Sequence, residues 1–251
     1  SNTAIGFRTL EANTTGNYIL ALGNFALFNN TTGTYNAGLG AYSDVTVGNL
    51  TNATAIGYSA LVSASNTVVV GNTSVGSIGG QVGWSTLSDA RFKKNVTTNE
   101  VKGLEFITRL TPVTYNYDIK ARARWNEQTF GRPDTMEWEG KYDIEKLRMS
   151  GFIAQDVEAL AKEIGYDFSG VDAPKNDKDF YGLRYAEFVV PLVKGMQEQQ
   201  EMIGQQQEQI EQQQAVIESQ QNEIHYLKEA NASSNESIKE IKAHLNLQTK
   251  K

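Results

Sequence analysis

The fold of the first third of the chain is decided by a short stretch that recurs five times: AIGF at 4–7, ALGN at 21–24, GLGA at 38–41, AIGY at 55–58 and VVGN at 69–72. The central glycines stand at positions 6, 23, 40, 57 and 71, which gives three equal intervals and a shorter fourth. A fixed period of this kind is typical of a solenoid, in which each repeat contributes one or two strands and a turn. Because each repeat carries few apolar residues, we expect stacked coils, and several chains packed together, to be needed for stability.

Composition divides the 251 residues into three zones, with boundaries near residues 87 and 190. Residues 1–87 carry three charged residues and 13 of the 22 glycines, and the charge density rises sharply from Ser88 onward. We therefore predict a mixed fold. It consists of a parallel β-roll or solenoid at 1–77, a flexible glycine-rich junction at 78–87, an α+β domain at 88–190 and an α-helical coiled coil at 191–251.

Charge and residue types exclude several classes of function. A net charge of −6 and a pI near 5.1 disfavour nucleic acid as a partner. The absence of cysteine rules out disulfides and thiolate metal sites, and the only histidines are His225 and His244, so we expect no metal and no cofactor. No run approaches 18 apolar residues, so we expect no membrane insertion. The chain starts without Met and inside a repeat, which favours the C-terminal part of a longer protein.

A heptad repeat dominates the last zone. Its a positions hold Val189, Met196, Ile203, Ile210, Ile217, Ile224, Asn231, Ile238 and Leu245. Its d positions hold Leu192, Gln199, Gln206, Gln213, Gln220, Leu227, Ser234 and Ile241. This register predicts a coiled coil, whereas the alternative, a glutamine-rich disordered tail, does not explain the regular isoleucines. The heptads alone do not fix the number of chains, and Gly204 and residues 231–235 are the weak points of the predicted helix.

Four blocks of the middle zone carry a family resemblance: SDARFKKNV at 88–96, LTPVTYNY at 110–117, GFIAQDV at 151–157 and residues 185–194. Their order closely resembles the intramolecular chaperone domain of phage endosialidases and tail fibres. That domain is a self-cleaving serine peptidase at the C-terminus of trimeric fibres. The stretch AIGYSAL at 55–61 in turn resembles the head repeats of trimeric autotransporter adhesins, which form a three-chain parallel β-roll. Together the resemblances imply a homotrimer.

The resemblance to the chaperone domain also implies a reaction. The chain is expected to be cut once, between Leu87 and Ser88, with Ser88 as nucleophile and Lys93 as the base of a Ser-Lys dyad. A serine without a nearby histidine needs such a lysine, which acts as a base only when its amine is neutral. Asp89 is expected to pair with Arg91 and hold the loop.

Two features of this segment bear on the reaction. Residues five apart point to opposite faces of a strand and are about 140° apart around a helix, so a contact between Ser88 and Lys93 requires a bend or a lysine from a neighbouring chain. Some family members have histidine where Leu87 stands, and this departure bears on the rate of cleavage. The non-reactive alternative is that 88–96 begins a charged strand that docks on the fibre.

The aromatic residues between the blocks could serve either packing or the binding of a glycan. Tyr115, Tyr117, Trp125, Phe130 and Trp138 are expected to serve packing rather than a glycan-binding face. Residues 122–139 are interpreted as an insertion or hairpin with a turn at 132–134, and a helix is predicted from Gln155, with Ala161 and Ile164 on its buried face, ending at Gly165.

These observations lead to two hypotheses about function. The first is the tip of a homotrimeric phage tail fibre or spike on the virion, whose chaperone domain drives trimerisation, sets the register of the β-fibre and cleaves itself. The second is a phage or bacterial surface adhesin with a non-cleaving chaperone domain, whose β-roll binds a host-surface glycan or receptor. A polysaccharide-degrading enzyme is disfavoured, because no paired carboxylates stand out in residues 1–87.

Overall fold

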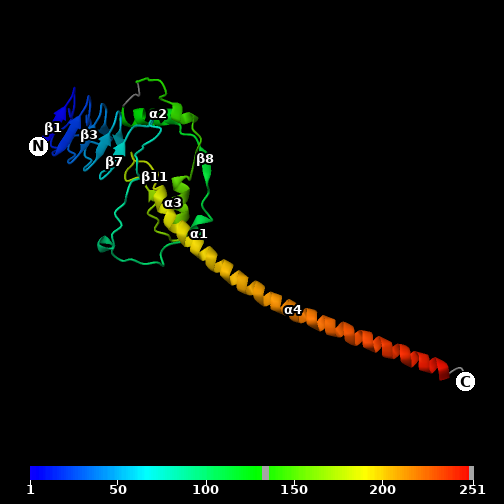
Figure 1. The fold of residues 1–251 in the computed structure, drawn as a ribbon. Helices are drawn as coiled ribbons and strands as arrows, with labels where there is room; N and C mark the ends of the chain where they lie inside the picture. The colour runs from blue at the N-terminus through cyan, green and yellow to red at the C-terminus, as the bar shows by residue number, and fades with distance from the viewer. Residues whose placement is uncertain (132–135, 249–251) are drawn as a thin grey trace.

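The computed structural model describes residues 1–131 and 136–248 and has three consecutive parts. A β-solenoid lies at the N-terminal end, a mixed α/β domain follows it, and one long helix extends away to the C-terminus (Figure 1). The predicted mixed fold is therefore confirmed for the single chain.

The solenoid is built from two stacks of short parallel strands. The larger sheet contains, in this order, β1 (Asn2–Ile5), β2 (Ile19–Leu22), β3 (Ala37–Leu39), β5 (Thr54–Ile56) and β7 (Val68–Val70). The smaller sheet pairs β4 (Asp44–Val45) with β6 (Leu61–Val62). Asn2 pairs with Ile19 and Thr54 with Val68, so successive coils are offset by the same intervals as the repeated glycines.

The repeated glycines are required by the close stacking of the coils. Gly23 has φ +131°, and a Cβ atom there would lie 2.6 Å from the carbonyl carbon of Gly40 in the next coil. Such a backbone angle and such an approach are compatible only with glycine. The regular period is therefore a consequence of backbone-to-backbone contact between coils.

The interior of the solenoid combines small apolar residues with buried amides. Asn30 and Asn36 are fully buried, and the amide nitrogen of Asn36 donates to Oδ1 of Asn30 at 2.7 Å and to the carbonyl of Leu50 at 2.7 Å. The backbone N–H of Ala53 donates to Oδ1 of Asn36 at 2.9 Å. These hydrogen bonds satisfy backbone N–H and C=O groups in the turns, which have no partner in the β-sheets. The polar residues of the repeats therefore stabilise the interior rather than the surface.

The middle domain surrounds a small aromatic core. Its elements are η1 (Ala90–Phe92), α1 (Leu104–Ile107), β8 (Val113–Tyr115), α2 (Ile119–Phe130), η2 (Asp143–Lys146), β9 (Met149–Gly151), α3 (Ala154–Glu163), β10 (Val171–Asp172), β11 (Gly182–Leu183) and η3 (Tyr185–Phe188). Strand β8 pairs antiparallel with β9, and β10 with β11. The core contains Phe106, Val157, Leu160, Ala161, Phe168 and Phe188.

The GFIAQDV block has a structural explanation. Gly151 ends β9 directly beside Tyr185, where a Cβ atom would overlap the phenolic oxygen. The same oxygen accepts a hydrogen bond from the backbone N–H of Phe152 at 3.2 Å. Val157 then enters the core from α3. The predicted helix is confirmed, with Ala161 buried and Gly165 at φ +64° just after its end.

Helix α4 (Val189–Gln248) is continuous over 60 residues and runs through both predicted weak points, Gly204 and residues 231–235, without a break. Its start packs against α1, since a Cβ on Gly195 would lie 2.5 Å from Cδ1 of Ile107. The carboxylate of Glu198 also accepts a hydrogen bond from the N–H of Leu104 at 2.7 Å. Beyond this anchor, heptad residues such as Ile210 and Ile217 are about half exposed in the single chain.

Two further expectations for the middle of the chain have clear outcomes. Residues 122–130 of the predicted insertion or hairpin lie in α2, so the hairpin reading is wrong for this part. Asp118 caps α2 by accepting a hydrogen bond from the N–H of Ala121. The turn expected at 132–134 lies outside the described residues. Within the described parts of the chain, no helix is long and apolar enough to cross a bilayer.

Candidate functional site

The predicted cleavage site lies on a long, exposed connecting segment. Residues 75–100 connect the last coil of the solenoid to the middle domain, and every one of them except the half-buried Asp89 is exposed. In Figure 1 this segment loops away from both parts. Residues 78–87, predicted as a junction, contain no strand or helix.

A short 3₁₀ turn bends the chain directly after Ser88. Asp89 caps η1: its carboxylate accepts hydrogen bonds from the N–H of Arg91 at 2.9 Å and from the guanidinium of Arg91 at 2.7 Å. The side-chain bond from Arg91, helped by its backbone N–H, lowers the pKa of Asp89. The predicted pairing of Asp89 with Arg91 is therefore present, and it holds the bend.

The bend brings the two members of the predicted dyad together. The amine of Lys93 donates a hydrogen bond to Oγ of Ser88 at 2.8 Å within the same chain. This meets the distance that a nucleophile and its base require. The charged strand that formed the non-reactive alternative is not seen, because Ala90–Phe92 is a 3₁₀ turn. The catalytic roles themselves remain predictions.

Two requirements of the chemistry are not met by one chain. Ser88 and Lys93 are both exposed, although a lysine acts as a base more readily when it is desolvated. The carbonyl oxygen of Leu87 accepts no hydrogen bond from any described residue, so an oxyanion donor is missing as well. Apolar side chains nearby are strongly exposed, with Trp84 at 93% and Leu87 at 76%.

A second candidate site was missed by the sequence analysis. A cavity of about 580 Å³ lies between the solenoid and α2, and its lining includes Phe25, Tyr42, Tyr58, Arg122, Asn126 and Trp138. Oδ1 of Asn126 is buried and has no hydrogen-bond partner among the described residues. Phe25 and Tyr42 stand one repeat apart and their rings stack at 5.2 Å, so their spacing is the sequence signal that points to this row of rings.

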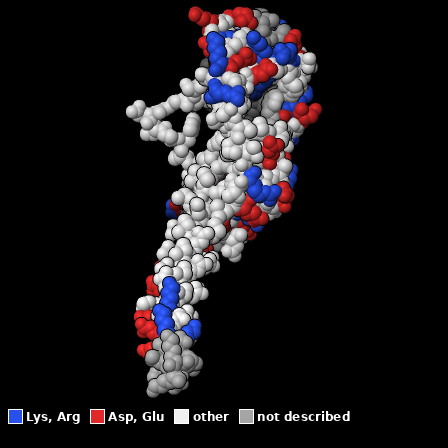
Figure 2. Space-filling model, turned by 90° about the vertical axis from the view of Figure 1, so that its right-hand side faces the viewer, with Lys and Arg blue, Asp and Glu red and all other residues white. Residues whose placement is uncertain are grey.

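Among residues 1–131 and 136–248, no three histidine or acidic side chains come together as a metal site. Figure 2 shows the charged residues mainly over the middle domain and near the far end of α4, with largely uncharged surface between them.

Comparison with known proteins gives one family match. No curated protein and no solved structure matches the chain. Residues 88–166 match the family described as chaperone of endosialidase. The match begins at Ser88, the residue that the bend joins to Lys93, and it includes α1, α3 and the β8–β9 pair. It supports a chaperone role of the phage tail-fibre type, and it does not extend to residues 1–87, whose likeness to adhesin heads stays a prediction. Residues 88–166 of this chain thus form a domain that resembles the chaperone of endosialidase.

Proposed function

We propose that this chain is the C-terminal tip of a homotrimeric phage tail fibre or spike. Its domain from Ser88 onward brings three chains into register and then cuts the Leu87–Ser88 bond once. The observation that carries this proposal is the 2.8 Å hydrogen bond from Lys93 to Ser88, at the first residue of the chaperone match.

The incomplete site supports assembly before cleavage. One chain provides the nucleophile and its base, but neither desolvates them nor donates a hydrogen bond to the Leu87 carbonyl from a described residue. Neighbouring chains that cover Trp84, Leu87 and Phe92 would exclude water from the dyad. Cleavage would then report that the trimer has folded.

The solenoid supports the need for a chaperone. Three of its four coil-to-coil offsets are equal, so a slip by one coil keeps most strand pairs and glycine contacts intact. A trimeric coiled coil built on α4 would align three chains at one end and remove this ambiguity.

The order of assembly and cleavage is the test of this proposal. Unfolded wild-type chain is refolded at two concentrations, and trimers and cut fragments are followed over time by native and denaturing mass spectrometry. We expect fragments to appear only after trimers, and at least threefold faster at a tenfold higher chain concentration. Cleavage of monomers at a concentration-independent rate would count against it.

A second candidate function, glycan binding, is favoured by the cavity beside the solenoid. Rings from the solenoid and Trp138 provide flat apolar faces, and Tyr58 meets Trp138 edge to face at 5.8 Å. The Arg122 guanidinium and Oδ1 of Asn126, which has no partner among the described residues, add a positive charge and an acceptor. This combination suits a sugar that carries both hydroxyl and carboxylate groups.

Glycan binding is tested by an array of acidic and neutral glycans probed with the wild-type chain. We expect binding to an acidic glycan that falls at least about tenfold in Arg122→Ala, because a charge-assisted hydrogen bond contributes roughly 1.5–3 kcal/mol. Arg124→Ala is the matched control, since Arg124 lies on the same helix but outside the cavity lining. Equal binding by both variants, or none by the wild type, would exclude this site.

A further inference from the structure

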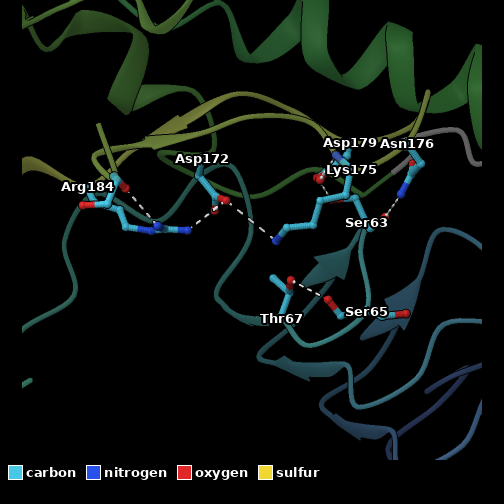
Figure 3. A network of polar contacts seen from close by, with 9 residues as sticks. Ser63, Ser65, Thr67, Asp172, Lys175, Asn176, Asp179 and Arg184 are labelled. Carbon is cyan, nitrogen blue, oxygen red and sulfur yellow. Dashed lines mark hydrogen bonds and ion pairs between the residues drawn. The ribbon is translucent and has the colours of Figure 1, made fainter. Parts of the chain in front are cut away.

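The parts of the chain before and after the Leu87–Ser88 bond also contact each other at a place far from that bond. Residues 172–181, which we name the latch loop, lie against the last coils of the solenoid (Figure 3). The contact joins Ser63 to residues 113 and 116 positions further along the chain. It therefore joins the N-terminal and C-terminal pieces that cleavage would produce, and it does not involve the connecting segment at residues 75–100.

The contact uses both polar groups of Ser63. Its hydroxyl donates to the carboxylate of Asp179 at 2.5 Å, and its carbonyl accepts from the amide nitrogen of Asn176 at 2.8 Å. All three residues are half-buried. Hydrogen bonds in such a position are screened less than those on an open surface.

Hydrogen bonds and ion pairs within the latch loop hold it in the conformation that this contact requires. The N–H of Lys175 donates to Asp179 at 3.0 Å, and the N–H of Lys178 donates to Oδ1 of Asn176 at 2.9 Å. At the base of the loop, Asp172 forms ion pairs with Lys175 at 3.7 Å and with Arg184 at 2.9 Å. The two side chains that reach Ser63 are thus held in place by their own loop.

Asp179 is charged at neutral pH in this arrangement. Burial by itself raises its pKa, but the hydrogen bonds from Ser63 and from the backbone N–H groups of Lys175 and Phe180 outweigh burial and lower its pKa overall. The bond from Ser63 is therefore charge-assisted, which makes it stronger than a bond between neutral groups.

The edge-to-face pair of Tyr58 and Trp138 adds a second contact between the same two pieces.

We propose that the latch loop is a docking surface for the end of the solenoid, and that it keeps the C-terminal piece bound after the chain is cut. This inference builds on the proposed cleavage, since only a cut chain has two pieces to hold. The end of a solenoid exposes unpaired strand edges and needs a cap. The bound C-terminal piece would supply that cap, so that cleavage and release become separate events.

The test cuts the chain without relying on its own chemistry. A recognition sequence for an added protease is inserted between Gly79 and Gly83 of the Ser88→Ala chain, where the segment is fully exposed. After digestion, the pieces are separated by gel filtration and identified by mass. We expect them to co-elute, and we expect Asp179→Ala to make them dissociate about tenfold to 100-fold faster.

Asp177→Ala is the matched control, because Asp177 lies on the same loop, is exposed and forms no hydrogen bond or ion pair with a described residue. Prompt separation of the pieces in the parent chain would overturn the proposal. Equal retention in Asp179→Ala and Asp177→Ala would also overturn it, because the trimer or the helix would then hold the pieces. Neither result depends on self-cleavage, so failure of the latch is distinguishable from failure of the proposed function.

Discussion

Replacement of Ser88 by alanine is expected to leave the chain at its full 251 residues and to leave the trimer unchanged. The substitution removes an exposed hydroxyl and no core volume, so it abolishes the nucleophile without a cost in folding. Lys93→Ala is expected to slow cleavage by about 10²- to 10⁴-fold, the usual contribution of a general base. Lys93→Arg is expected to fail as well, because a guanidinium does not give up its proton in proteins.

Lys94→Ala is the matched control for the dyad, since Lys94 is the adjacent exposed lysine and the amine that reaches Ser88 is that of Lys93. We expect this variant to be cut at the wild-type rate. Refolding Ser88→Ala chains together with Lys93→Ala chains adds a further test. Because Lys93 meets Ser88 within one chain, mixed trimers should not recover cleavage. Cleavage of Ser88→Ala, or recovery in the mixture, would contradict the assignment of an intrachain dyad.

Replacement of Ile217 and Ile224 by aspartate is expected to abolish the trimer. These a-position side chains are 45% and 51% exposed in the single chain, and each would contribute about 1.5–3 kcal/mol when buried in every chain of the trimer. Aspartates in the same layers would also repel one another. The native mass should fall from three times 27.7 kDa to one, and no cleavage should follow.

The control for the heptad variant carries the same two aspartates on the opposite face, as Ala215→Asp with Asn222→Asp. Both are f positions of the same heptad register, Ala215 in the heptad that begins at Ile210 and Asn222 in the heptad that begins at Ile217, and they point away from the predicted coiled-coil interface. We expect the control to form trimers and to be cut. Trimers of the a-position variant with normal cleavage would show that α4 does not drive assembly.

The solenoid was predictable from the sequence because its period is imposed by backbone contact. Gly23 meets Gly40 so closely that only glycine fits, and this requirement leaves a visible mark in each successive repeat. The heptads of α4 were predictable for a similar reason, and the helix runs through Gly204, its predicted weak point, without a break. In both cases the same local requirement recurs at a fixed spacing along the chain, so the sequence pattern is distinguishable from chance.

The candidate site was predictable only in part. The residues of the dyad came from the family resemblance, whereas the 3₁₀ turn that joins them depends on short-range hydrogen bonds between Asp89 and Arg91, which have no periodic signal in the sequence. The contact of Ser63 with Asp179 left no trace in the sequence, because serine and aspartate 116 positions apart carry no periodicity. The cavity was missed because its lining comes partly from the solenoid and partly from α2.

The most direct test of the central claim is the mass of the denatured wild-type chain after trimer assembly. We expect two pieces, one that ends at Leu87 and one that runs from a new N-terminus at Ser88 to Lys251. A single uncut mass from assembled trimers would contradict self-cleavage at this bond.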